Sequence, residues 1–277
     1  MSDSAVQGSF LVRASGFGEL FDCAHRWEAK HLLGMRLPSS PAAAIGTAVH
    51  AGTAAFDQAR VIGEHFRPAD AADVVIASLD ESESEGIDWN VDPDVRRSTA
   101  ERIALACTTR YCVEVSPRYT FVGVEEKATP LSIDCGGGIV ITLTGTLDRT
   151  RRVVGTTGKR LADVKTGRRA ISQGRAVTGR HRAQVGTYVL LDEHTHGEAH
   201  TADPEIIAIS TATNPETPVA VAPVPGAREL MVGGPDYPGL IEHAAAMFRS
   251  GLFPPNPSSS LCSARYCPRW STCRYHE

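Results

Sequence analysis

The segment LADVKTG, residues 161–167, combines a strand pattern with two charged side chains. Its leucine, alanine and valine favour an extended strand, and the Thr-Gly pair that follows favours a turn. Because side chains alternate between the two faces of a strand, Asp163 and Lys165 lie on one face and Ala162 and Val164 on the other. The segment therefore presents a carboxylate beside an ammonium group, either as an ordinary ion pair of an exposed edge strand or as part of a site.

A second carboxylate is expected next to this pair. Asp148 lies near the end of the β-branched run GGIVITLTGTLDR, residues 137–149, and a short hairpin brings the strand over 160–166 back beside it. Neighbouring strands lie about 4.8 Å apart, so Asp148 and Asp163 are placed to share one cation. Two carboxylates suit Mg²⁺ or Mn²⁺, and an adjacent lysine suits metal-assisted hydrolysis of a phosphodiester.

The rest of the chain predicts helices around a β-meander, within one domain over residues 1–277. The order of elements is typical of an α/β protein with a mixed central sheet flanked by helices. The expected parts are a helical N-terminal part over 10–115, a catalytic core over 118–215, and a C-terminal helix with a cysteine-rich tail over 236–277. We expect helices at 15–34 (capped by Ser15), 42–60, 69–80, 95–114, 181–194 and 237–253, an acidic loop at 80–94, and strands at 119–126, 137–149, 151–154, 160–166 and 205–213.

The charge of the chain is unevenly distributed. The net charge is −4, but residues 149–182 contain eleven Lys or Arg and one acid, Asp163, which leaves −14 for the remainder. Such a segment suits a local surface for nucleic-acid phosphates, and a solvated basic hairpin without a partner is the alternative. Of the neighbouring pair Glu125 and Glu126, period 2 lets only one face the site, and Glu126 is a weak candidate beside the simpler role of surface charge.

Composition and cysteine usage favour a cytoplasmic protein. The 277 residues are 42% hydrophobic and 22% charged, as in globular domains, and we expect neither a signal peptide nor a membrane span. Seven cysteines in a reducing compartment favour metal binding over a disulfide framework. Three of them, Cys262, Cys267 and Cys273, fall within the twelve residues CSARYCPRWSTC, one short of the usual tetrahedral set.

Taken together, these motifs resemble the PD-(D/E)XK nuclease superfamily, and specifically its RecB-like branch. The resemblance rests on four motifs in order: Gly46 to His50, Asp148 in GTLD, Asp163-x-Lys165, and Gln184 to Tyr188. It implies that Lys165 is catalytic and that Gln184 and Tyr188 face the DNA or brace the site. It also implies that a metal is bound by His50, Asp148, Asp163 and the carbonyl of Val164.

The same resemblance implies an iron-sulfur cluster. RecB-like iron-sulfur nucleases take one cysteine before the nuclease core and three after it, which adds Cys23 to the three tail cysteines as ligands of a [4Fe-4S] clasp joining the two ends of the chain. The first tail spacing departs from the family, since it is C-x4-C where C-x2-C is common. Zinc and free thiols therefore remain alternatives, and Cys107, Cys112 and Cys135 are interpreted as structural.

The function implied by the resemblance is Mg²⁺- or Mn²⁺-dependent DNA cleavage. We expect an exonuclease that acts on single strands or DNA ends in recombination, repair or CRISPR-type adaptation. No P-loop motif is present, so a helicase or recombination partner would supply any unwinding. A silent DNA-binding subunit and a zinc-stabilised interaction module are the alternatives. The arginines expected along the path of the strand are Arg149, Arg151, Arg152, Arg168, Arg169, Arg180 and Arg182.

Overall fold

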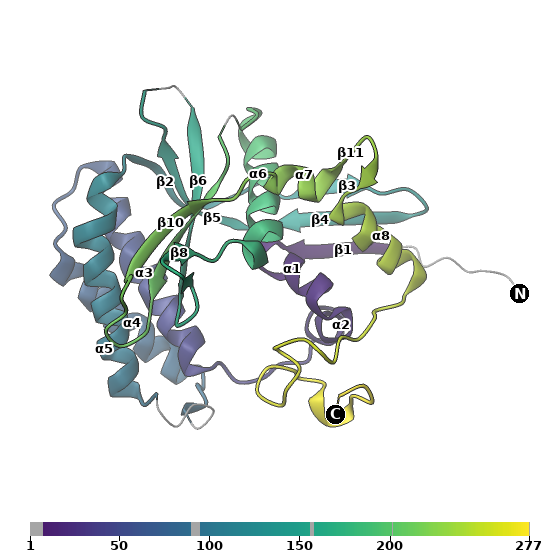
Figure 1. Ribbon diagram of the computed structural model, residues 1–277, viewed down its shortest axis with the longest axis horizontal. Helices are drawn as coiled ribbons and strands as arrows, with labels where there is room; N and C mark the ends of the chain where they lie inside the picture. The colour runs from purple at the N-terminus through teal and green to yellow at the C-terminus, as the bar shows by residue number, and fades with distance from the viewer. Residues whose placement is uncertain (1–7, 90–94, 156–157, 201, 277) are drawn as a thin grey trace, which may run out of the picture.

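A five-stranded mixed sheet forms the centre of the computed structural model, which describes residues 8–89, 95–155, 158–200 and 202–276 (Figure 1). The strand order is β10-β9-β6-β5-β2. Strands β2, β5 and β6 form the antiparallel meander expected from the sequence, β9 runs parallel to β6, and β10 is antiparallel to β9. The predicted mixed sheet is confirmed. The strands are β2 (Phe121–Lys127), β5 (Thr146–Arg152), β6 (Lys159–Gly167), β9 (Glu205–Ser210) and β10 (Val219–Pro223).

A second, three-stranded sheet continues from the first. It consists of β1 (Gly8–Arg13), β4 (Ile139–Thr144) and β3 (Leu131–Asp134) in the order β1-β4-β3. The single strand predicted over 137–149 is therefore wrong, because the chain passes from β4 to β5 at Gly145 and changes sheets there. A side chain at this point would meet the Tyr188 ring at 2.9 Å and the Ala14 Cβ at 3.3 Å, so glycine allows the close crossing.

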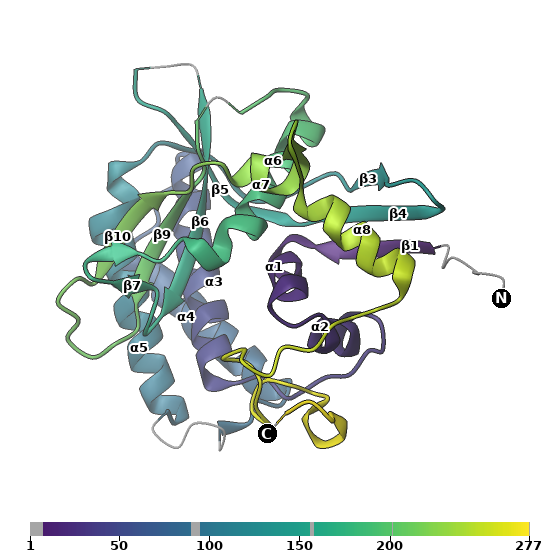
Figure 2. The same cartoon turned by 45° about the vertical axis from the view of Figure 1, so that its right-hand side comes forward.

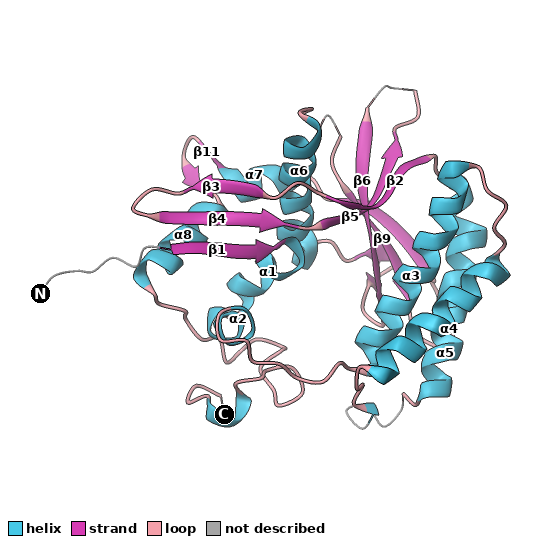
Figure 3. Cartoon of the chain, turned by 180° about the vertical axis from the view of Figure 1, so that it is seen from behind, coloured by secondary structure: helices cyan, strands magenta, loops and turns pink. Residues whose placement is uncertain are grey.

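Helices cover both faces of the large sheet and enclose two cores (Figure 3). On one face, α3 (Pro41–Ile62), α4 (Pro68–Ser84) and α5 (Arg97–Arg110) pack against Val164 and Ile207. On the other face, Ile206 and Ala208 belong to the core formed with α6 (Arg182–His196), α1 (Ala14–Asp22), α7 (Ala227–Val232) and α8 (Leu240–Ser250). Because Asp163 alternates with Val164 on β6, it points toward α6.

The N-terminal helix differs from the prediction. The chain forms α1 (Ala14–Asp22) and α2 (Ala24–His31) with Cys23 between them in an extended conformation, and Arg13, not Ser15, precedes the first helical residue. The C-terminal tail binds this break, since the Asn256 side-chain amide donates to the Asp22 carbonyl at 2.8 Å. The tail runs beneath α1 and α2 in Figure 2.

The remaining elements are short or adjust the predicted bounds. Helix α4 extends into the predicted acidic loop, part of which, residues 90–94, lies outside the described residues. None of the described helices has the length and apolar content to cross a membrane. The other elements are a π-helical turn at Tyr111–Val115, 3-10 turns at Ser116–Arg118, Gly179–His181 and Trp270–Thr272, β7 (Ile171–Ser172), β8 (Arg175–Ala176), α7 (Ala227–Val232), β11 (Gly233–Gly234), β12 (Tyr237–Pro238) and α8 (Leu240–Ser250).

Candidate active site

Asp148 and Asp163 lie where two central strands diverge. The ladder between β5 and β6 ends at the pair Arg149 and Ala162, so the next residues on each strand, Asp148 and Asp163, stand at the opening. The Asp148 Oδ2 atom accepts the backbone N–H of Val164 at 3.0 Å, which satisfies a donor that the missing ladder would leave free. Both carboxyl groups are nearly buried.

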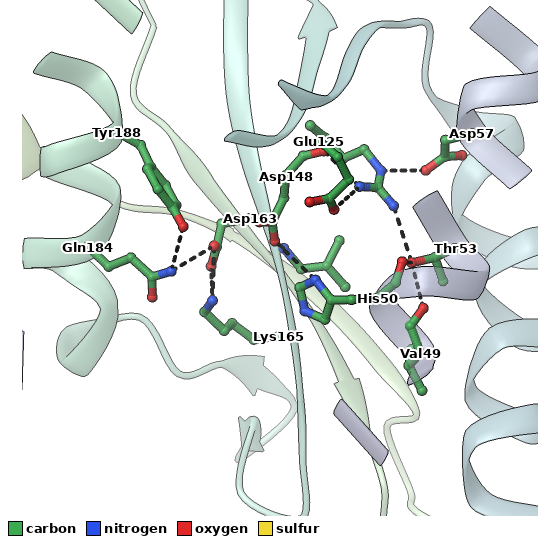
Figure 4. A network of polar contacts seen from close by, with 12 residues as sticks. Val49, His50, Thr53, Asp57, Glu125, Asp148, Asp163, Lys165, Gln184 and Tyr188 are labelled. Carbon is green, nitrogen blue, oxygen red and sulfur yellow. Dashed lines mark hydrogen bonds and ion pairs between the residues drawn. The ribbon is translucent and has the colours of Figure 1, made fainter. Parts of the chain in front are cut away.

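Helix α6 and Lys165 surround Asp163 with donors (Figure 4). The Lys165 Nζ atom lies 2.9 Å from Asp163 Oδ1 and 2.8 Å from Oδ2. The Gln184 amide donates to Asp163 Oδ1 at 3.3 Å and to the Tyr188 hydroxyl at 3.0 Å. Gln184 and Tyr188 are one helical turn apart, so α6 presents both to the same place.

His50, Glu125 and Asp148 form the candidate metal group. Among the described residues, this is the one set of three or more His, Cys, Asp or Glu residues whose ligand atoms lie within 4.8 Å of one another. His50 comes from α3, and its Nδ1 atom is 3.5 Å from Asp148 Oδ2. The sequence offered Glu126 only as a weak candidate beside the simpler role of surface charge, and Glu126 pairs with His196 at 2.9 Å. Glu125 joins the group instead, in a strand that is irregular: the register of β2 shifts, and Glu125 has a φ of 49°.

The pKa shifts at the site are caused by burial and by neighbouring charges. Burial raises the pKa of Asp163 to about 7, Lys165 opposes this shift and the Asp148 carboxylate adds to it. Burial lowers the pKa of Lys165, but Asp163 and Asp148 together raise it above its ordinary value. Burial also lowers the pKa of His50 against the opposing effect of Asp148, which favours the neutral imidazole that binds metals. A divalent cation would relieve the repulsion between the two carboxylates.

Arg149 is fully buried, so the prediction that it contacts DNA is wrong. It follows Asp148 on β5 and therefore points to the opposite face, toward α3. Its Nε atom donates to Asp57 at 2.7 Å, and its other nitrogens donate to Glu125 at 3.1 Å and to Thr53 at 3.2 Å. Arg149 thus holds the candidate ligand Glu125 and ties β5 to α3.

The other predicted arginines divide into two groups. Arg151 pairs with Glu205 at 2.7 Å and lies over the Tyr119 ring at 4.8 Å, so it is mostly buried and the prediction of a DNA contact is wrong. Arg182 is half-buried and donates to the carbonyl of Pro225 at 3.2 Å, which occupies its guanidinium. The exposed members of the set are Arg152, Arg168, Arg169 and Arg180.

The four predicted cluster cysteines line one cavity. It lies between the α1–α2 break and the tail, and Cys23, Cys262, Cys267 and Cys273 all contribute to it. Burial and the three neighbouring thiols raise the pKa of Cys262. No three of these sulfurs lie within 4.8 Å of one another, whereas thiolates around one zinc ion are about 3.8 Å apart. Cys107 and Cys112 are buried elsewhere, with pKa values raised by burial to about 11 and about 12.

The splayed strands with two carboxylates, a lysine and a nearby histidine define a site suited to metal-dependent hydrolysis. The chain matches the family model of the PD-(D/E)XK nuclease superfamily over residues 14–274 and belongs to that superfamily, whose members are typically metal-dependent nucleases. None of the curated proteins matches the sequence. The resemblance drawn from the sequence is therefore confirmed at the level of the superfamily.

Proposed function

We propose that this protein is a Mg²⁺- or Mn²⁺-dependent DNA nuclease of the RecB-like branch. The observation that carries the proposal is the meeting of Asp148, Asp163 and Lys165 at the divergence of β5 and β6, with His50 beside them. Helix α3 and strands β5 and β6 supply these groups. Lys165 contacts Asp163, and His50 lies close to Asp148. An incidental surface ion pair would not require this convergence.

The donor set fits a hard divalent cation. His50, Glu125 and Asp148 would hold it, and Asp163 and the Val164 carbonyl are the further candidate ligands. When bound, the cation would polarise the scissile phosphate and favour hydroxide near neutral pH. Lys165 is placed to stabilise the charge that develops on the phosphate, and Gln184 fixes Asp163 through its amide.

The substrate class follows from the exposed cations near the end of β6. Arg168 and Arg169 follow β6 directly, and the Arg180 guanidinium donates to the Arg169 carbonyl at 3.3 Å, so the three lie together. Such a group binds strand phosphates without reading sequence. We infer an exonuclease acting on single strands or DNA ends in recombination, repair or CRISPR-type adaptation, with unwinding supplied by a helicase or recombination partner.

The cavity of Cys23 and the tail cysteines supports a [4Fe-4S] cluster as the second cofactor. Four thiols from both ends of the chain line one cavity, and four cysteine thiolates are the ligand set of a [4Fe-4S] cluster. The cluster would fix the tail against α1 and α2. The proposed nuclease site does not depend on which metal this cavity holds.

The proposal is tested with anaerobically purified protein on single- and double-stranded DNA labelled at either end, with Mn²⁺ or with EDTA. We expect metal-dependent degradation that the Asp163→Ala variant lacks, and the order of product lengths will give the polarity. Intact DNA in every lane would overturn the proposal. Salt-sensitive DNA binding by that inactive protein would then indicate a silent binding subunit.

A further inference from the structure

A pocket of about 470 Å³ lies beside the candidate active site, where the two sheets meet. Its walls come from three places at which the chain changes element: the junction of β1 and α1, the end of β2, and the junction of β4 and β5. Asp148 and Tyr188 also line it. The pocket is therefore continuous with the site at which we propose hydrolysis.

Two exposed cations, Arg13 and Lys127, line the pocket. In the part of the chain that the structure describes, neither forms an ion pair or a side-chain hydrogen bond. This sets them apart from Arg149 and Arg151, whose guanidinium groups are bound by buried acids. Asp148 is the one acidic residue of the lining, and it belongs to the candidate metal group.

The remaining lining is suited to an anion. The hydroxyl-bearing residues Ser15, Thr144 and Thr146 line the same pocket. Ser15 also lies in the first turn of α1, where backbone N–H groups lack helical partners. Arg13 and Lys127 supply net positive charge next to a carboxylate-rich site, where a phosphate would otherwise be repelled.

We propose that this pocket is a second phosphate subsite, in which Arg13 and Lys127 hold the phosphate next to the scissile one on the same strand. The inference rests on the proposed nuclease function. A strand whose scissile phosphate lies at Asp148 and Lys165 must continue into adjoining space, and this pocket adjoins Asp148 directly. The phosphate is either the terminal group of a DNA end or an internal phosphate of a longer strand.

The test measures binding of short, internally labelled single strands by fluorescence anisotropy, with Ca²⁺ in place of Mn²⁺ and strand length checked after each titration. The strands carry a 5′-phosphate, a 3′-phosphate or neither, and a circular strand lacks ends. Wild type is compared with Arg13→Ala, Lys127→Ala and Lys127→Arg. Arg102→Ala serves as the control, since Arg102 is an exposed arginine on α5, outside this pocket. Thermal melting verifies that each variant is folded.

We expect Arg13→Ala and Lys127→Ala each to weaken binding about tenfold and to lower the slope of log affinity against log salt by about one. Lys127→Arg and Arg102→Ala should bind as wild type does. If removal of one terminal phosphate weakens wild type but not the two alanine variants, the pocket holds a DNA end. If the variants lose affinity equally for all strands, the circle included, it holds an internal phosphate.

Wild-type binding and cleavage together with unchanged affinity and salt slope in both alanine variants would overturn the subsite and leave the nuclease proposal standing. Absence of both binding and cleavage in the wild-type protein would overturn the nuclease proposal and the subsite with it. The two failures are therefore distinguishable.

Discussion

At the scale of single residues, burial and the charge of Lys165 shift the pKa of Asp163 in opposite directions. Burial raises its pKa to about 7, while Lys165 and Gln184 donate to the same carboxyl group. When a group binds a proton more tightly in the folded state than in the unfolded state, the folded protein loses stability as that group ionises. The arrangement is therefore costly without a cation, as is common for catalytic sites.

We predict that the unfolding free energy of the Asp163→Asn variant rises relative to that of wild type as the pH increases. In wild type, the contribution of Asp163 is fully present below its unfolded pKa of 3.8 and is lost as pH rises through about 7, whereas asparagine does not ionise. Between pH 5 and 8 the unfolding free energy of the variant, relative to wild type, should rise by about 3 kcal/mol. Urea unfolding in EDTA measures this. The exposed control Asp203→Asn should show no such trend, and a flat difference for Asp163→Asn would contradict the account.

At the scale of elements, the buried charges join β5 to α3. Arg149 and Asp57 are both fully buried and 2.7 Å apart, and the Tyr111 hydroxyl donates to the same Asp57 carboxylate at 2.5 Å. Removing one partner of a buried pair leaves an uncompensated charge, which costs more than the pair contributes.

We predict that Arg149→Met lowers the unfolding free energy by about 3–5 kcal/mol. The double variant Asp57→Asn with Arg149→Met should be less destabilised than the sum of the two single variants, since it removes both charges. Chemical denaturation of wild type, the two single variants and the double variant measures the coupling free energy between the two residues. Strict additivity of the two losses would show that the pair is not coupled and would sink this interpretation of the network.

Gly145 lies where the chain passes from one sheet to the other, close to the ring of Tyr188. A Cβ atom there would lie 2.9 Å from the Tyr188 ring and 3.1 Å from Leu191. We predict that Gly145→Ala costs about 1–3 kcal/mol of stability and slows cleavage by moving Tyr188 away from Gln184. Gly179→Ala, where no atom lies within 4 Å, is the matched control for both measurements. Equal melting temperatures and cleavage rates for both variants would contradict the prediction.

Several elements could be predicted from periodicity, and others could not. Helix α3, strand β6 and helix α6 are long and strongly patterned, so their residues alone predict them. Strands β1 and β10 and helix α7 are short, and they depend on neighbours that pair with them only in the fold. The break at Cys23 has the same cause, because the tail that binds it lies more than two hundred residues away.

The candidate site shows the same division. Asp148, Asp163 and Lys165 follow from strand alternation and a hairpin, whereas choosing Glu125 over Glu126 required knowledge of an irregular strand. The burial of Arg149 could also be predicted from the sequence, since alternation from Asp148 places Arg149 on the opposite face of β5.

At the scale of the whole molecule, the tail and the N-terminal helices meet at the four-cysteine cavity. We predict that anaerobically purified protein absorbs in the visible region and that Cys267→Ser loses this absorbance. If the cluster contributes about 3 kcal/mol, its loss should lower the melting temperature by about 5 °C. Cys135→Ser, which lies outside the cavity, is the control. A colourless protein with an unchanged melting temperature in Cys267→Ser would overturn the cluster.

The central claim is that the groups at the divergence of β5 and β6 hydrolyse DNA. Its most direct test is the single-turnover cleavage rate of Lys165→Met and wild type at saturating Mn²⁺, with Mn²⁺ affinity measured on the same preparations. We predict a loss of about a hundredfold or more in rate with little change in affinity, because in the proposed mechanism Lys165 stabilises the reacting phosphate and does not bind the metal. A variant that cleaves as fast as wild type would contradict it and locate hydrolysis outside this site.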